Sequence, residues 1–384
     1  MSQPATKAGA GATGAAAAGG RPPGILIYGM YDISSATSAP KVRIAMMTEA
    51  LAKQVHAERI VGGRLGRATA SIRWLASGGP RRVGAVYVES ATTSAMPTDL
   101  AFLVVMRLLR RPVGVYFRDA YQLFRGLYPR QRRRQRLSDV LWLLTTPLLK
   151  RVASRRFATS AGLARALKLR EAVLLGPGAD PTLPDLGPGT GPLVAYVGGN
   201  EWADGFDLLL DAMVIVHDKR PDARLLLVGP ALASARQEAL PPYVESRQSG
   251  RSGLAELLAE ARVCVIPRPI TAYSDLAVPV KLVDYLSLGK PVVATAAAET
   301  EAILKTSGAG IATPDTPAGL AEGLLAVISN DDLARRLSAN ARAYACSPEA
   351  TWDARAVTVL AALGLVSSAS PPESGAAATL NADG

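Results

Sequence analysis

The sequence is poor in the residues on which metal and redox chemistry depend. Its 384 residues include only two cysteines, Cys264 and Cys346, and two histidines, His56 and His217. These few residues indicate neither a disulfide framework nor a histidine-based metal site, and no Asp-x-Asp cluster is present that would hold a metal between phosphates. We therefore expect a protein of the reducing cytoplasm that uses no metal and no cofactor.

Long apolar runs are also missing. No run approaches the roughly 18 apolar residues that a membrane-spanning helix needs, so any membrane contact is expected at the surface. The first twenty residues are rich in Ala and Gly and lack the apolar centre of a signal peptide. We expect disordered tails at residues 1–22 and 366–384.

The remaining sequence alternates short apolar strands with helical patterns, which predicts parallel α/β sheets. Segments with this alternation are 25–28, 40–50, 86–89 and 113–117, and then 193–197, 205–217, 224–228, 253–261, 263–266 and 310–312. A stretch dense in Gly and Pro separates the two sets. The pattern predicts two Rossmann-like domains, at 23–178 and 193–345, with a linker at 179–192.

The most informative stretch is 277–295, AVPVKLVDYLSLGKPVVAT. Pro279 suits the first position of a helix, which would leave the N–H groups of residues 280–282 without helical partners. Such a helix start favours a phosphate. Lys281 and, three residues later, Asp284 would add one positive and one negative group. The alternative is an ordinary helix–strand unit of a doubly wound domain.

This segment resembles the donor-site signature of the retaining glycosyltransferases of family four (glycosyl transferases group 1), Pro-x-Lys-x-x-Glu-Tyr-Leu-x-x-Gly-x-Pro-Val-Val. Asp284 stands where those enzymes usually carry the Glu that bonds the nucleotide ribose. A second family Glu, eight positions earlier, falls on Leu276, with Ser274 and Asp275 beside it. The resemblance implies a GT-B fold, in which two Rossmann-like domains face each other across a cleft. It also implies metal-independent, retaining transfer from a nucleotide diphosphate sugar, with a UDP-sugar favoured.

The loop after the strand at 193–197 carries Gly198, Gly199 and Asn200. In many relatives an Arg and a Lys from this loop neutralise the departing diphosphate, but Asn200 and Asp204 occupy those approximate places here. The resemblance then leaves the diphosphate to Lys281, the helix start and Arg268. A simple tight turn is the alternative for the Gly pair. The full set of expected donor-binding residues is Gly198, Gly199, Asn200, Arg268, Ser274, Asp275, Pro279, Val280, Lys281 and Asp284.

Acceptor-side candidates lie at the carboxyl ends of the first set of strands, where parallel sheets bind their ligands. These candidates are Gly29, Tyr31, Glu89, Arg118, Asp119 and Tyr121. We expect Lys281, Asp119 and Arg118 to be the catalytic residues, with Asp119 as an acceptor contact or base. A helix N-cap is the alternative for Asp119.

Positive charge is concentrated in residues 101–170, which contain 17 Lys and Arg against two Asp. An arginine cluster at 130–136 leads into apolar residues at helical spacing, Leu137, Val140, Leu141, Leu144 and Leu148. This pattern is typical of an interfacial helix, which favours a lipid-linked or glycan acceptor at the inner face of a bacterial membrane, in polysaccharide or glycolipid synthesis. The alternative is a charged face on an ordinary amphipathic core helix. Sparse aromatics and the lack of a nucleic-acid module argue against nucleic acid.

The last apolar stripe, Trp352, Ala356, Val359, Leu360 and Leu363, fits the final helix of the GT-B fold, which crosses back to the first domain. We expect this helix within 346–365.

Two other functions stay open, because Leu276, Asn200 and Asp204 depart from the family pattern. One is a non-catalytic glycosyltransferase-like subunit that docks on a membrane, and the other is a sugar-nucleotide epimerase.

Overall fold

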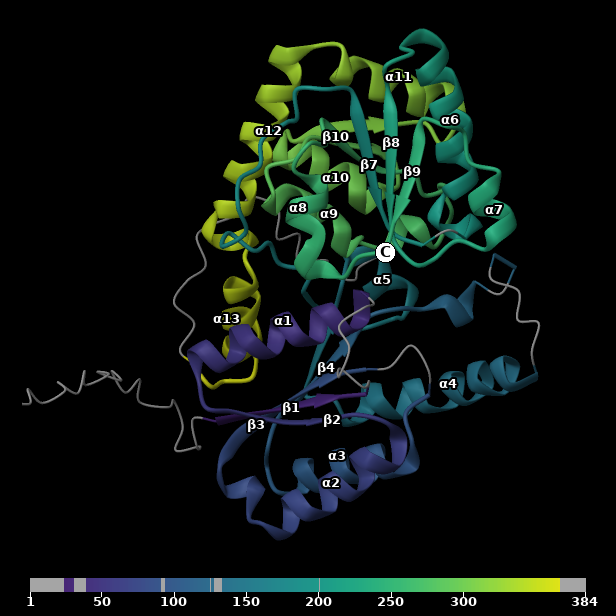
Figure 1. Cartoon of the computed structure of the whole chain (residues 1–384). Helices are drawn as coiled ribbons and strands as arrows, with labels where there is room; N and C mark the ends of the chain where they lie inside the picture. The colour runs from purple at the N-terminus through teal and green to yellow at the C-terminus, as the bar shows by residue number, and fades with distance from the viewer. Residues whose placement is uncertain are drawn as a thin grey trace, which may run out of the picture.

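The computed structural model describes residues 24–30, 39–90, 94–124, 126–127, 133–199 and 201–366. The expected tails apart from Val366, and also Tyr31, Asn200, Arg130 and Arg132, lie outside the described residues. Val366 packs against the core of the first unit. The chain forms two layered α/β units, each with a six-stranded parallel sheet between helices (Figure 1). This arrangement agrees with the two Rossmann-like units expected from the alternating pattern.

The first sheet has the strand order β2-β1-β3-β4-β5-β6. Its strands are β1 (Gly24–Gly29), β2 (Ala57–Val61), β3 (Val83–Glu89), β4 (Val113–Phe117), β5 (Arg155–Ala158) and β6 (Val173–Leu174). The helices between them are α1 (Ala39–Gln54), α2 (Arg64–Ala76), α3 (Pro97–Leu108), α4 (Arg133–Val152) and α5 (Ala161–Ala166). The sequence pattern did not predict β2, β5 and β6, because these strands at or near the sheet edges are short and carry charged or half-exposed residues.

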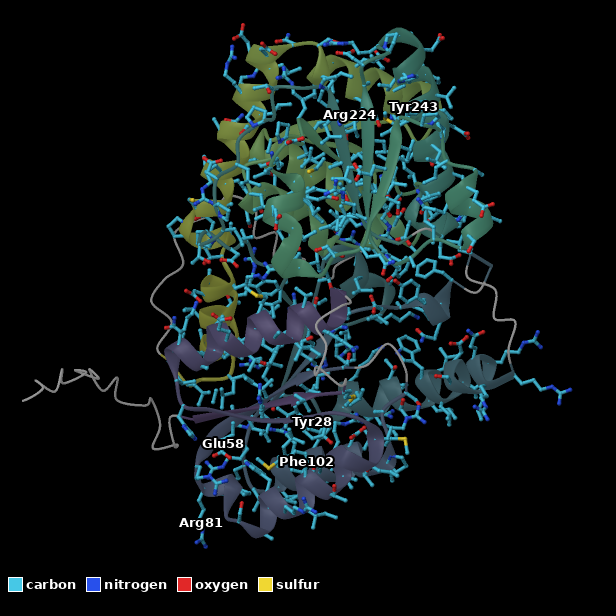
Figure 2. All side chains as sticks on the ribbon, viewed as in Figure 1. Tyr28, Glu58, Arg81, Phe102, Arg224 and Tyr243 are labelled. Atoms are coloured by element: carbon cyan, nitrogen blue, oxygen red, sulfur yellow. The ribbon has the colours of Figure 1, made fainter. Side chains whose placement is uncertain are left out.

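Alternate residues of β1 enter two different cores, as the period of two in a strand requires. Leu26 and Tyr28 pack with α2, α3 and α4, and the Tyr28 ring stacks on Phe102 of α3 with centroids 5.1 Å apart (Figure 2). Ile25 and Ile27 face the other side of the sheet, toward α1. Both faces of the sheet are therefore buried.

The second sheet has the order β12-β11-β10-β7-β8-β9. Its strands are β7 (Leu193–Val197), β8 (Arg224–Val228), β9 (Val244–Arg247), β10 (Val263–Ile266), β11 (Val292–Thr295) and β12 (Gly310–Thr313). Its helices are α6 (Phe206–Lys219), α7 (Ser234–Glu238), α8 (Leu254–Leu258), α9 (Val280–Ser287), α10 (Ala298–Ser307), α11 (Pro317–Ile328) and α12 (Asp331–Cys346). Since β7 lies between β8 and β10, the strand order reverses beside β7, and a ligand crevice is expected at its carboxyl end.

The last helix, α13 (Trp352–Ala362), returns to the first unit and packs against α1 (Figure 1). Trp352, Val359 and Leu360 are buried in the same core as Ile25 and Ile27. This confirms the back-crossing helix that the apolar stripe predicted.

Helix α4 exposes most of the apolar stripe at its surface. Leu137 and Leu144 are 60% and 62% exposed, while Trp142 and Leu149 on the opposite side are buried in the first core. The predicted stripe therefore lies on the solvent-facing side of α4, while a different face of the same helix packs on the core. Within the described residues, no helix combines the length and apolarity needed to cross a bilayer.

Candidate donor site

Helix α9 begins one residue later than the sequence predicted. Pro279 is its N-cap, not its first helical residue, and Val280 is the first residue of the helix. The N–H group of Leu282 donates to the Pro279 carbonyl at 3.1 Å. Contrary to the expectation, this group therefore has a partner within the helix and is not available to a ligand. The helix ends as predicted, with Gly289 in the left-handed region at φ 68°.

The side chain of Lys281 reaches the carboxyl end of β7. Its Nζ donates to the Tyr196 hydroxyl at 3.4 Å and lies 4.5 Å from the centroid of that ring. Gly198 follows β7 directly, and a Cβ there would lie 2.3 Å from Nζ. The amine therefore occupies space that only a glycine at 198 leaves free.

The charges around Lys281 come from two other loops. Burial lowers the pKa of Lys281 to about 8; the carboxylate of Asp204 opposes this shift, and the guanidinium of Arg268 adds to it. Arg268 follows β10, and its Nε is buried without a hydrogen-bond partner among the described residues. Two cations and one carboxylate thus gather at the crevice beside β7.

The Gly198–Gly199 turn is held by its neighbours. The Gly198 N–H donates to the Val228 carbonyl at 2.9 Å, and the Tyr196 hydroxyl donates to the Gly199 carbonyl at 2.7 Å. A small cavity beside this turn is lined by Tyr196, Gly198, Gly199 and Gly229, among others. The structure therefore brings together Gly198, Gly199 and Lys281 with Arg268 close by.

Asp284 faces a different partner from Lys281. Its Oδ1 accepts from Arg251 Nη2 at 3.0 Å and from Arg251 Nε at 3.3 Å. Burial raises the pKa of Asp284, the Arg251 guanidinium opposes this, and Asp180 adds to it. No local sequence pattern indicates Arg251, because this residue reaches α9 from the loop after β9.

Two expected donor residues are engaged in local structure. Asp275 Oδ1 accepts from the N–H of Ala298 at 2.9 Å, at the start of α10. The Ser274 hydroxyl is buried in a turn with Thr271. Leu276, at the position of the second family Glu, packs against the first unit, and its carbonyl accepts from the Ser160 hydroxyl at 2.7 Å.

The acceptor-side residues form a connected group at the carboxyl ends of β3 and β4. Glu89 is fully buried and accepts from Tyr87 at 2.8 Å and from Arg118 at 3.1 Å. Arg43 of α1 adds an ion pair to Glu89 at 3.3 Å. Glu89 is therefore placed to orient Arg118, while Gly29 lies at the end of β1 and packs near Val61.

Asp119 and Tyr121 contact the second unit through Tyr273. The Tyr273 hydroxyl donates to Asp119 Oδ1 at 3.1 Å, and the rings of Tyr121 and Tyr273 lie 4.3 Å apart. Asp119 does not cap the short helix that follows, whose N-cap is Ala120. The aromatic contact joins the two units at the edge of the crevice.

In the described part of the chain, no three His, Cys, Asp or Glu residues gather closely enough to hold a metal ion.

The second unit matches the model of a known protein family. Residues 191–330 match the model of the family described as "Glycosyl transferases group 1". The matched segment contains the Gly198–Gly199 turn and all of α9. The resemblance found in the 277–295 motif is thus confirmed for the second unit. No curated protein sequence matches the chain at a significant level.

Solved structures resemble the chain over most of its length. Sucrose-phosphate synthase from Thermosynechococcus elongatus matches with a TM-score of 0.64 and 16% identity, covering 88% of this chain and 97% of that one. HepE from Anabaena, in complex with UDP and glucose, has a TM-score of 0.60 and 16% identity, with coverages of 88% and 98%. WaaG, a glycosyltransferase involved in lipopolysaccharide biosynthesis, has 0.61 and 14%, with 87% and 99%. At these identities the likeness shows the fold, which is GT-B as expected.

Proposed function

We propose that the protein is a glycosyltransferase that moves a sugar from a nucleotide diphosphate sugar to a hydroxyl acceptor. The observation that carries the proposal is the amine of Lys281, which extends from the first turn of α9 to the Gly198 turn. The group 1 match over residues 191–330 supports it. UDP-sugars are the favoured donors, because HepE was solved with UDP and with UDP-glucose.

The proposed chemistry requires positive charge where the diphosphate departs. Lys281 and Arg268 supply two cations, and the start of α9 adds backbone dipoles aimed at the same region. Asp204 brings one negative charge close to Lys281, so the site is less cationic than the Arg and Lys pair of many relatives would make it. Asp284 would accept a hydrogen bond from a ribose hydroxyl.

The acceptor would enter from the first unit, with residues 23–178 as the acceptor-side domain and 193–345 as the donor domain. Arg118, held by Glu89, and Asp119, held by Tyr273 of the second unit, are the proposed acceptor contacts. Retention at the anomeric carbon and independence from metal are part of the proposal.

The first test is thermal stabilisation by UDP, GDP, ADP and CMP. A nucleotide at 100 times its dissociation constant should stabilise the protein by about 2.7 kcal/mol. The effect should disappear in Asp284→Ala and persist in Asp332→Ala, which removes an exposed aspartate on α12. If none of the nucleotides stabilises the wild type, the non-catalytic docking subunit becomes the better explanation.

A second test separates transfer from its alternatives. The protein is incubated with the stabilising UDP-sugar, with and without a hydroxyl acceptor, in EDTA and in Mg²⁺. A glycosyltransferase gives an acceptor product whose anomeric configuration matches that of the donor. A changed UDP-sugar formed without acceptor would indicate an epimerase, and activity that EDTA abolishes would contradict metal independence.

We also propose that α4 brings the enzyme to a lipid-linked acceptor at an anionic membrane surface. Arg133 and Arg134 at its start are exposed, and the exposed leucines follow on the same helix. Trp142 and Leu149 anchor the opposite side of the helix to the core. Each basic residue near an anionic leaflet contributes about 1 kcal/mol, and the leucines would enter the interface.

Vesicle sedimentation tests this proposal. Binding should be strong on vesicles with anionic lipid, weak on zwitterionic ones, and lost in Leu144→Glu. The control is Val214→Glu, which places the same charge at a residue 55% exposed on α6. Equal binding of the two variants would show that α4 is not the membrane surface. Cytoplasmic localisation at the inner face of the membrane is proposed on the same basis.

A further inference from the structure

Arg251 is the residue that holds the carboxylate of Asp284. It begins a short 3-10 helix, η4 (Arg251–Gly253), in the loop after β9. Its Nε and Nη2 approach Asp284 at 3.3 and 3.0 Å, and both contacts end at the same oxygen, Oδ1. No described residue donates a hydrogen bond to Oδ2, so this is the oxygen that we assign to a ligand hydroxyl.

The same guanidinium touches two other parts of the chain. Nη2 lies 3.6 Å from Asp180 Oδ2 in the connection between the two units, and Nη1 lies 3.1 Å from Met46 Sδ in α1. The side chains of Arg251, Asp284 and Asp180 are only 23%, 15% and 14% exposed. The guanidinium is therefore held by contacts on three sides and is largely shielded from solvent.

We propose that Arg251 is a positioning residue for the donor nucleotide: it fixes Oδ1 of Asp284 so that Oδ2 faces a ribose hydroxyl. The inference rests on the proposed function, since it takes Asp284 as the ribose ligand. An aspartate is one methylene shorter than a glutamate and has fewer rotamers, so the neighbour that holds its carboxylate decides where the free oxygen points.

Arg251 also favours the ionised form of the Asp284 carboxylate. Burial and Asp180 raise the pKa of Asp284, while Arg251 opposes them. Without the guanidinium this pKa rises further, and a larger share of Asp284 is protonated as the pH falls. Loss of Arg251 should therefore weaken nucleotide binding more at pH 6 than at pH 8.

The test measures UDP affinity of the full chain by calorimetry at pH 6, 7 and 8. The variants are Arg251→Gln, Arg251→Lys and, as control, Arg335→Gln, which breaks an exposed pair with Asp332 on α12. We expect Arg251→Gln to bind roughly tenfold more weakly at pH 7, because it loses a charge-assisted contact. The ratio of variant to wild-type dissociation constants should increase toward pH 6. Taking the ratio cancels the titration of UDP itself.

The outcomes distinguish this inference from the proposed function. Arg251→Lys should recover part of the affinity, and Arg335→Gln should bind as wild type does. Affinity of Arg251→Gln within twofold of wild type, or a ratio that does not change with pH, overturns the positioning role alone. If Arg251→Gln does not fold, a lysine variant with wild-type affinity and pH profile also overturns it. A wild type that binds no UDP, GDP or ADP overturns the proposed function and this inference together.

Discussion

Lys281 gives the proposed donor site a pH dependence whose size follows from its pKa of about 8. Only the protonated amine attracts a diphosphate. About nine-tenths of the amine is protonated at pH 7 and about one-tenth at pH 9, since each pH unit above the pKa lowers the protonated share tenfold. Between these two pH values, the dissociation constant of UDP should therefore rise about tenfold.

Calorimetric titration with UDP at half-unit steps from pH 7 to 9 measures this rise. The terminal phosphate loses its second proton near pH 6, so the ligand contributes little over the interval. Lys281→Arg is the matched variant, because a guanidinium stays charged throughout and its profile should be flat. Uridine, which lacks the diphosphate, should also bind with a flat profile.

Two results would refute the reasoning. A wild-type profile that is flat from pH 7 to 9 would show that the amine of Lys281 does not contact the diphosphate. An equal slope in wild type and Lys281→Arg would assign the titration to another group.

The remaining predictions concern packing and the glycine turn. Leu360→Ala should lower the free energy of unfolding in urea by about 2–5 kcal/mol, because the side chain is fully buried against the first sheet. Val357→Ala, at a residue 44% exposed on the same helix, should stay within about 0.5 kcal/mol. Truncation after Cys346 removes α13 and should make the first unit susceptible to limited proteolysis. Gly198→Ala should weaken UDP binding at least about tenfold, because its Cβ would lie 2.3 Å from Lys281 Nζ, 2.5 Å from the Tyr196 hydroxyl and 2.8 Å from the Tyr196 Cζ, and so displace both side chains.

Each of these predictions has a contrary result. Equal destabilisation by Leu360→Ala and Val357→Ala would mean that α13 is not docked through this face. A truncated chain whose first unit resists protease as before would contradict the back-crossing contact. Unchanged UDP affinity in Gly198→Ala would show that the diphosphate does not use this turn.

Much of the fold could be predicted from local patterns. Buried apolar runs predict the central strands, which are β1, β3, β4, β7, β8, β10 and β11. Pro279 at one end and Gly289 at the other predict the limits of helix α9. The sequence pattern does not predict the edge strand β2, because Glu58 and Arg59 interrupt its apolar run. The sequence predicts the start of α9 one residue too early, since proline is accepted both at the N-cap and at the first helical residue.

The sequence by itself determined the local features of the proposed donor site. These are a glycine turn after one strand, a lysine in the first turn of a helix and a carboxylate three residues after that lysine. These signals are local, because turn and helix geometry depend on neighbouring residues. Only the tertiary structure decided that Lys281 contacts Tyr196 and is influenced by the charge of Asp204, while Asp284 contacts Arg251. It also decided that the leucines of α4 stay exposed and that Asp275 supports α10. The physical reason is that these contacts join segments far apart in the chain, and strand order and helix packing, not local sequence, bring such segments together.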